Sequence, residues 1–219
     1  MDVHPDEAAR RLAAARAGEP TAWFEDLYRA AGAGTAVVPW DRPAANPLLV
    51  EWVEREGPPT SARAIVVGAG YGRDAEYLGA LGHPTTAFDV SPSAVEQTRA
   101  RYPYSVVTYA VADLLDLPER WRGAYDLVVE SMNVQALPEP PRSEAIRAAA
   151  GLVAPGGTLL VIAFGADGTV DQRVASSGPP WPLVRSEIDA FAVNGIYLDA
   201  LERLYPDDEL RWRATFRRP

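Results

Sequence analysis

The chain has 219 residues, of which 47% are hydrophobic, and this size suits a single globular domain. Its 30 acidic and 21 basic residues give a formal net charge of −9, which disfavours nucleic acid as a partner because like charges repel. The lack of cysteine excludes disulfides, cysteine-ligated zinc, iron–sulfur clusters and thiol nucleophiles.

Metal and membrane binding are also disfavoured by the sequence. Two histidines are too few for a histidine-rich metal site, so we expect no metal. No stretch reaches about 18 continuous apolar residues, and the acidic start lacks the apolar core of a signal peptide. We therefore expect a cytoplasmic protein that has no membrane partner. The sequence does not predict its oligomeric state.

Residues 1–60 are predicted to form a helical arm. Residues 5–20 and 21–32 have helical spacing, three prolines break residues 35–47, and residues 48–57 form a short amphipathic helix that ends at a glycine. The following segment PPTSAR is a plausible hinge, so the whole chain is expected to be one domain with the arm attached to its core.

From residue 63 onward, apolar strands alternate with helices. The predicted strands are 63–67, 84–90, 105–113, 125–131 and 158–164, and the predicted helices between them are 72–82, 91–103 and 140–153. Apolar strands that alternate with helices indicate a parallel sheet with both faces covered.

The end of the chain follows a different pattern. A helix at 186–195 precedes two extended segments, 196–205 and 210–219, which are joined only by PDDE. A connection this short joins antiparallel strands. We therefore predict a Rossmann-like, doubly wound α/β fold, with a mostly parallel seven-stranded sheet and an antiparallel C-terminal hairpin.

Three glycines lie where the first strand meets the first core helix. Gly68, Gly70 and Gly72 fall near the point where doubly wound sheets bind ligands, although a tight turn without a ligand would also use glycine. A dinucleotide fingerprint would place its third glycine at Arg73, so a nucleotide-dependent oxidoreductase is disfavoured. Asp89 ends the second strand, where a carboxylate can accept both hydroxyls of a ribose or can simply cap the next helix.

Acidic side chains also follow the next two strands. Asp113 is placed to accept a hydrogen bond from the exocyclic amine of adenine, and Glu130 is expected to point into the same crevice. No lysine or arginine is paired with the glycine loop in P-loop fashion. Three carboxylates beside such a loop favour a nucleoside that carries a cationic portion and no phosphate.

The core segments resemble the class I S-adenosylmethionine-dependent methyltransferases. The resemblance is carried by VVGAGYGRDA, TAFDVSPSAVEQ, VADLLDL, YDLVVES and LVAPGGTLLVI, although Val66 stands where many members have an acidic residue. It implies S-adenosylmethionine as the cofactor and an antiparallel last strand. The implied cofactor contacts are Gly68, Ala69 and Gly70 at the methionine part, Asp89 and Val90 at the ribose, Ala112, Asp113 and Leu114 at the adenine, and Trp23, Trp40 and Glu130 around them.

The arm is similar to the N-terminal signature of thiopurine S-methyltransferase-like proteins. The matching positions are Trp23, Tyr28, Gly34, Pro39, Trp40, Asp41, Pro47 and Leu48. The resemblance implies that residues 1–60 fold over the cofactor and substrate as a lid. The simpler alternative is that Trp23 and Trp40 only pack the arm onto the core.

The expected activity is methyl transfer to a small molecule, most readily to a thiol or another soft nucleophile, because a thiol is partly ionised near neutrality. The catalytic residues stay unassigned, with Glu130 and Asp41 as candidate carboxylate bases. Tyr28, Asn133, Gln135, Phe164 and Trp181 are expected to line the acceptor pocket, and their aromatic rings suit a flat or apolar acceptor.

Two other functions stay open. The first is O- or N-methylation of a small aromatic metabolite, with Glu130 as the base. The second is a protein that binds S-adenosylmethionine or S-adenosylhomocysteine without catalysis.

Overall fold

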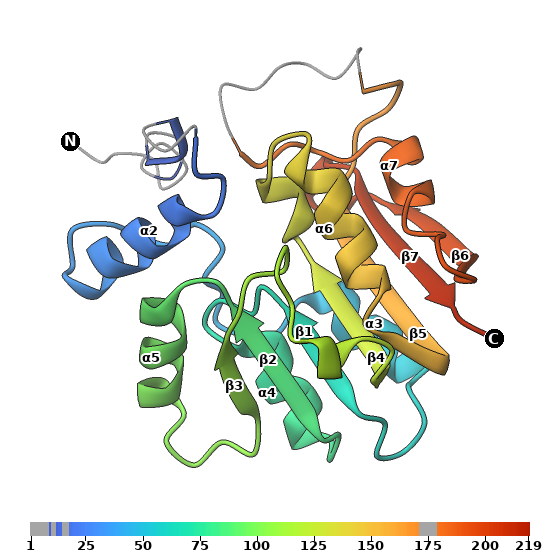
Figure 1. The fold of residues 1–219 in the computed structure, drawn as a ribbon, viewed down its shortest axis with the longest axis horizontal. Coiled ribbons are helices and arrows are strands. Elements are labelled where there is room, and N and C mark those ends of the chain that lie inside the picture. The colour runs from blue at the N-terminus through green and yellow to red at the C-terminus, as the bar shows by residue number, and fades with distance from the viewer. Residues whose placement is uncertain (1–8, 10–11, 15–17, 171–178) are drawn as a thin grey trace.

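The computed structural model describes residues 9, 12–14, 18–170 and 179–219, so most of the helix predicted at 5–20 lies outside the described residues. A seven-stranded sheet with the order β3-β2-β1-β4-β5-β7-β6 forms its centre. The strands from β3 to β5 in this order run parallel, and β7 is antiparallel to both β5 and β6. The predicted fold class is therefore confirmed (Figure 1).

The elements follow the predicted order closely. The strands are β1 (Ala64–Val67), β2 (Thr85–Asp89), β3 (Thr108–Val111), β4 (Tyr125–Ser131), β5 (Val153–Phe164), β6 (Tyr197–Leu204) and β7 (Arg211–Arg217). The α-helices are α2 (Ala22–Gly32), α3 (Pro47–Arg55), α4 (Arg73–Ala80), α5 (Pro92–Arg101), α6 (Pro141–Ala150) and α7 (Arg185–Asp189). Short 3-10 helices are η1 (Glu119–Trp121), η2 (Val134–Ala136) and η3 (Pro206–Asp208).

Helices cover both faces of the sheet because side chains alternate along each strand. Along β4, Leu127 and Val129 belong to the apolar layer under α3 and α4, whereas Val128 belongs to the layer under α6 and α7. Figure 1 shows α6 in front of the sheet and α4 behind it. This arrangement leaves the carboxyl ends of the parallel strands free to form a site.

The predicted arm is divided in the structure. In α3, Leu49 is fully buried and Trp52 is 1% exposed, and both belong to the apolar layer behind the sheet. The Trp52 indole nitrogen donates a hydrogen bond of 2.9 Å to the hydroxyl of Thr215 on β7. Helix α3 is thus part of the core, whereas α2 lies on the other side of the molecule, next to α5 (Figure 1).

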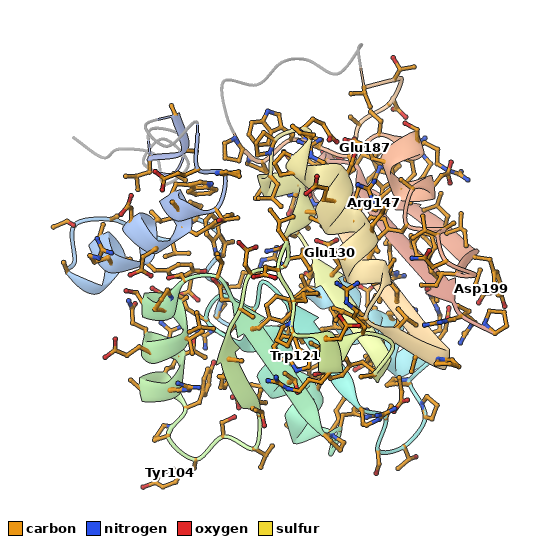
Figure 2. The ribbon with its side chains drawn as sticks, in the orientation of Figure 1. Tyr104, Trp121, Glu130, Arg147, Glu187 and Asp199 are labelled. Carbon is orange, nitrogen blue, oxygen red and sulfur yellow. The ribbon has the colours of Figure 1, made fainter. Side chains whose placement is uncertain are left out.

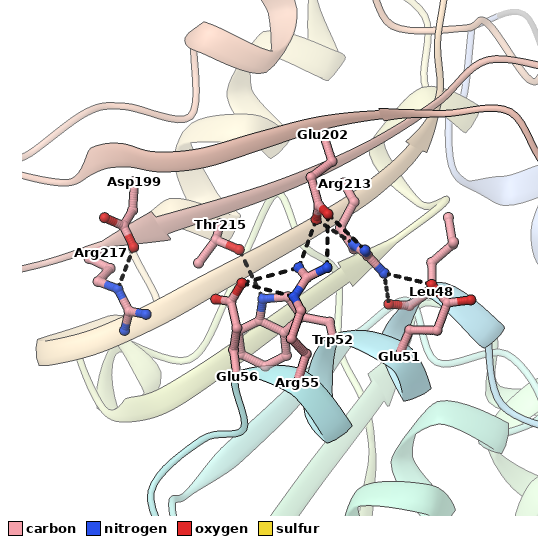
Figure 3. A network of polar contacts seen from close by, with 10 residues as sticks. All are labelled: Leu48, Glu51, Trp52, Arg55, Glu56, Asp199, Glu202, Arg213, Thr215 and Arg217. Carbon is pink, nitrogen blue, oxygen red and sulfur yellow. Dashed lines mark hydrogen bonds and ion pairs between the residues drawn. The ribbon is translucent and has the colours of Figure 1, made fainter.

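A polar network fastens α3 to the antiparallel hairpin (Figure 3). Arg213 on β7 is 2% exposed, and its guanidinium donates to the Glu202 carboxylate on β6 at 2.6 and 2.9 Å. The same guanidinium reaches α3 through the Leu48 carbonyl at 3.0 Å and Glu51 at 3.1 Å. Hydrogen bonding to Arg213 lowers the pKa of Glu202 to about 2, so the network stays charged at neutral pH.

Candidate functional site

The glycine loop after β1 takes a backbone conformation that favours glycine. The φ angles of Gly68, Gly70 and Gly72 are 56°, 52° and 76°, all in the left-handed region. Space is also restricted, because a Cβ on Gly68 would overlap the side-chain nitrogen of Asn133. A Cβ on Gly70 would lie 2.8 Å from the Tyr28 hydroxyl. The three glycines therefore allow close approach of other groups to the loop.

Asp89 joins this loop to the end of β2. Its two carboxylate oxygens accept hydrogen bonds from the backbone N–H of Gly70 and of Ser91, each at 2.9 Å. Burial raises the pKa of Asp89 to about 6, although these two hydrogen bonds oppose the shift. Each carboxylate oxygen has further lone pairs, so Asp89 can still accept hydrogen bonds from a ligand. The cap of α5 is supplied separately, by the Ser91 hydroxyl, which accepts from Ala94 N–H at 3.0 Å.

A cavity of about 280 Å³ runs along the carboxyl ends of β1 to β5. Among the described residues, it is lined by nearly all the side chains that we predicted for the site. These are Trp23, Tyr28, Trp40, Asp41, Gly68, Ala69, Gly70, Asp89, Val90, Ala112, Asp113, Leu114, Asn133, Gln135 and Phe164. The roles assigned to them stay predictions.

Part of the predicted arm covers the glycine loop, and we call α2 together with Pro39–Asp41 the cover. The Trp40 indole nitrogen donates a hydrogen bond of 2.7 Å to the Tyr28 hydroxyl, and this hydroxyl lies over Gly70. The Tyr28 ring also packs edge-on against Tyr71, with ring centroids 5.2 Å apart. The cover therefore forms one wall of the cavity at the end where the glycine loop lies.

Glu25 docks the cover onto the core. Its carboxylate accepts hydrogen bonds from the Ser91 hydroxyl at 2.6 Å, the Ser93 hydroxyl at 2.7 Å and the Ser93 N–H at 3.0 Å. A carboxylate at the N-terminus of α5 is also favoured by the helix dipole. Burial raises the pKa of Glu25, but its hydrogen bonds to Ser91, Ser93 and Arg29 outweigh this effect and keep the pKa below its ordinary value.

Asp41, a candidate base, is engaged in ion pairs. One carboxylate oxygen lies 3.5 Å from the Arg73 guanidinium and 3.4 Å from the Arg101 guanidinium. Arg101 in turn lies over the Tyr71 ring at 4.2 Å, and Arg73 donates to the Tyr102 hydroxyl at 2.8 Å. These contacts give Asp41 a clear structural role in holding the cover against α4 and α5.

A set of hydrogen-bonded polar side chains lines the cavity where α3 and α4 begin. The Asp74 carboxylate accepts the Asn46 N–H at 2.7 Å, and the Asn46 amide nitrogen donates to the Ser131 hydroxyl at 3.0 Å. Burial raises the pKa of Asp74, whereas the nearby positive charge of Arg42 lowers it. Arg42 also lines the cavity, so a cation and an anion face this part of the site.

Glu130 does not lie where we predicted. It is fully buried in the interior of the molecule (Figure 2) and is not among the residues that line the cavity. One carboxylate oxygen accepts the N–H groups of Asn133 and Val134, each at 2.8 Å, and the other is buried without a hydrogen bond in the described structure. Burial raises the pKa of Glu130 to about 7. The strand ends in a tight turn that folds back over this carboxylate, which is why it does not enter the crevice.

Trp181 is also displaced from its predicted place. It is not among the cavity-lining residues, and its ring lies 5.4 Å from the Arg142 guanidinium. Its backbone N–H donates to the Gln135 carbonyl at 2.8 Å, so Trp181 supports the wall without forming it. The neighbouring Pro179 and Pro180 line the cavity in its place.

The structure adds lining residues that sequence reasoning missed, among them Phe24, Arg42, Asn46, Asp74, Ser131 and Leu137. Asp74 carried a signal, because it lies in the first turn of the helix that follows the glycines, where α4 begins at Arg73. Arg42 and Asn46 lie in a proline-rich segment, and no periodicity reveals which way such side chains point.

The described residues also bear on metal binding and on membrane insertion. No group of three or more histidine, aspartate or glutamate side chains in this part of the chain is arranged to hold a metal ion. None of the described helices combines the length and apolar character that a membrane span requires.

The sheet order, the glycine loop and the acidic residue at the end of β2 together point to one class of enzyme. The sheet is that of the class I methyltransferases, and residues 64–157 match the family model described as a methyltransferase domain. Residues 64–157 are therefore similar to a methyltransferase domain, and the class I enzymes that share this sheet order use S-adenosylmethionine as the cofactor.

Curated relatives match part of the chain. A ubiquinone biosynthesis O-methyltransferase from Xanthomonas axonopodis pv. citri (strain 306) is 34% identical over 120 residues, which cover 54% of this chain and 49% of the relative. The chain thus spans about half the length of the curated relatives that it matches.

Two solved structures show the same fold. One, from work on the conversion of a disulfide bond into a thioacetal group during echinomycin biosynthesis, has a TM-score of 0.71 at 20% identity and covers 89% of this chain and 91% of its own. The other is the 1,6-didemethyltoxoflavin-N1-methyltransferase of Burkholderia thailandensis with bound 1,6-didemethyltoxoflavin and S-adenosylhomocysteine. Its TM-score is 0.66 at 16% identity, with 100% of this chain and 92% of that chain covered.

Proposed function

We propose that the protein transfers the methyl group of S-adenosylmethionine to a small molecule, with a thiol or another soft nucleophile as the first candidate acceptor. One observation carries this proposal. A single cavity joins the glycine loop, Asp89 and Asp113 at one end to Gln135 and Phe164 at the other. The first end suits the cofactor and the second suits an acceptor.

The residues present fit the parts of the cofactor. Asp89 and Asp113 offer carboxylates to the ribose hydroxyls and the adenine amine. Arg42 and Asp74 offer a cation and an anion to the carboxylate and ammonium of the methionine part. Asn133, which we predicted on the acceptor side, lies against Gly68 and so is assigned to the boundary between the two ligands.

The reaction needs alignment more than acid–base help. A lone pair of the acceptor attacks the methyl carbon, the bond from that carbon to the sulfonium sulfur breaks, and neutral S-adenosylhomocysteine leaves. Alignment of two bound reactants supplies up to about 7–11 kcal/mol of such a barrier. The cover, which forms one wall, is assigned to alignment and to the exclusion of water.

The surroundings of the candidate bases support an acceptor that ionises by itself. Glu130 lies outside the cavity lining, and Asp41 is paired with two arginines. Among the described residues that line the cavity there is no histidine. A thiol with a pKa of about 8.5 is partly thiolate near neutrality without a base. The thiopurine S-methyltransferase-like signature also supports sulfur, since Trp40 and Asp41 of that signature lie at the cavity.

Oxygen is the second candidate for the methyl-accepting atom. It is favoured by the curated relatives, which are ubiquinone biosynthesis O-methyltransferases. A phenol with a pKa of about 10 would react as its anion at higher pH than a thiol.

The test measures methyl transfer from S-adenosylmethionine to a series of thiols and phenols as a function of pH. We expect the rate with each acceptor to rise with pH until that acceptor is ionised, so that the inflection follows the acceptor's own pKa. We expect Glu130→Gln to leave this pattern unchanged. One inflection shared by all acceptors, and lost in Glu130→Gln, would show an enzyme-borne base. Binding of the cofactor without turnover of any acceptor would favour the non-catalytic alternative.

A further inference from the structure

Gln135 in η2 is held in a defined orientation at the acceptor end of the cavity. Its side chain is 1% exposed, and its amide oxygen accepts the Phe164 N–H at 2.7 Å. A backbone N–H can be met only by the oxygen of the amide, so this contact distinguishes the oxygen from the nitrogen. The main chain of Gln135 is fixed as well, because its carbonyl accepts the Trp181 N–H at 2.8 Å.

The amide nitrogen of Gln135 is therefore the group left for a ligand. Gln135 lines the cavity, and no described residue accepts a hydrogen bond from this nitrogen. An amide nitrogen carries two N–H donors, and a ligand that supplies an acceptor atom at this point would pair with one of them.

The surroundings of this donor are rigid and mostly apolar. Glu130 fixes the preceding turn through the N–H groups of Asn133 and Val134. Phe164 lines the cavity and is held by the Arg211 guanidinium, 3.7 Å from the ring centroid. Leu137, which lies two residues after Gln135, also lines the cavity, as do Pro179 and Pro180, which directly precede Trp181.

The formal charges of the cavity belong to other elements than Gln135 and Phe164. The aspartates Asp41, Asp74, Asp89 and Asp113 and the arginines Arg42 and Arg73 belong to the cover, to the segment that follows it, or to the elements from β1 to β3 and their loops. The acceptor end thus combines rings and prolines with one neutral donor. Such a lining selects a flat apolar molecule through a single hydrogen bond.

We propose that Gln135 determines specificity by donating a hydrogen bond to an oxygen of the acceptor molecule, separate from the atom that receives the methyl group. The substrate class is then a flat, largely apolar ring that carries a nucleophile and a neighbouring hydrogen-bond-accepting oxygen. This inference rests on the proposed function, because it takes this end of the cavity as the acceptor site.

The test uses two matched pairs of ring compounds that differ in one oxygen. The first pair is 2-methoxyphenol and 2-ethylphenol, and the second is 2-methoxybenzenethiol and 2-ethylbenzenethiol. Each methoxy oxygen can only accept a hydrogen bond, and each ethyl group has nearly the same bulk. Binding to the protein–S-adenosylhomocysteine complex is measured by calorimetry, so that no turnover is needed.

We expect the wild-type complex to bind the methoxy member of each pair about five- to tenfold more tightly, because one hydrogen bond contributes about this much to affinity. Gln135→Glu keeps an oxygen for the Phe164 N–H but replaces the donor by a carboxylate, so at pH 8 the preference should vanish or reverse. Gln135→Met has no donor, and its preference should vanish without reversing. Affinity for S-adenosylhomocysteine should stay within about twofold in both variants.

The possible results distinguish a failure of the Gln135 assignment from a failure of the proposed function. If wild type fails to bind S-adenosylhomocysteine, the proposed function is wrong. If it binds this ligand but shows no methoxy preference, or binds none of the four compounds at millimolar concentration, the assignment of Gln135 is overturned. A preference that persists in both variants overturns it too.

Discussion

Two helices from the region predicted as one arm, α3 and α2, relate to the core in different ways. Helix α3 buries Trp52 behind the sheet and is tied to the hairpin through Arg213, whose guanidinium is almost completely enclosed. Helix α2 also buries aromatic rings, but its polar contacts run through Glu25 to the first turn of α5, directly beside Asp89.

The difference separates a structural role from a functional one. Loss of α3 would expose one apolar face of the central sheet, whereas loss of α2 and Trp40 would open the glycine loop. We therefore expect α3 to govern the stability of the fold and the cover to govern ligand affinity.

The largest expected effect is on the stability of the fold, when the Trp52 side chain is removed. Trp52→Ala removes a side chain that is 1% exposed and leaves Thr215 without its donor, so we expect it to lower the free energy of unfolding by about 3–5 kcal/mol. Urea denaturation measures this change.

The matched control for Trp52→Ala is Trp40→Ala, because Trp40 is the corresponding large ring on the cover. It should cost much less stability and instead weaken the binding of S-adenosylhomocysteine. Equal losses of stability in the two variants would contradict the division between α3 and the cover.

A truncation gives the next largest effect. Removal of residues 1–44 deletes α2 and Trp40 but keeps Asn46, which caps α3. We expect the remaining chain to fold, to bind S-adenosylhomocysteine roughly ten- to hundredfold more weakly, and to lose turnover because water enters the cavity. Circular dichroism and calorimetry measure the two properties.

A smaller change supports the truncation. Tyr28→Phe keeps the ring over Gly70 but removes the hydroxyl that accepts from Trp40. We expect weaker cofactor binding without a change in the fold. Full turnover by the truncated chain would show that the cover is not needed as a lid.

Sequence reasoning found most of the cavity because parallel strands bring their carboxyl ends to one edge. Gly68, Asp89 and Asp113 could be located from strand order alone, since each directly follows a clearly apolar run. The same reasoning placed Glu130 wrongly. The residue ends a strand as expected, but the chain turns back so that two N–H groups meet its carboxylate.

The role of α3 was harder to predict. Its sequence is amphipathic, as that of a surface arm would be, and its hydrogen-bond partners Thr215 and Arg213 come from the hairpin at the other end of the chain. Such long-range pairing leaves no periodic signal. Trp181 shows the same difficulty, because a proline-rich loop gives no rule for the direction of a side chain.

The smallest expected effect is that of the Glu25 charge on the pH dependence of ligand binding. Burial raises the pKa of Asp89 to about 6, and the charge of Glu25 adds to this shift. A ribose needs the ionised carboxylate as its acceptor, so affinity for S-adenosylhomocysteine should fall as the pH drops through about 6. The stability of the ligand-free protein should change in the opposite direction. Because the pKa of Asp89 is raised in the folded state, its protonation increases the free energy of unfolding as the pH falls from about 6 towards 4.

Glu25→Gln tests whether the cover acts through Asp89. It removes a negative charge, so the pKa of Asp89 should fall and the acid limb of the binding curve should move to lower pH. At pH 8 the same variant should bind S-adenosylhomocysteine a few-fold more weakly, because the serine hydrogen bonds that dock α2 are weakened. Calorimetry between pH 5 and pH 8 measures both, and Asp89→Asn, which cannot titrate, is the control without an acid limb. An acid limb that stays in place in Glu25→Gln, or that persists in Asp89→Asn, would mean that another group controls binding.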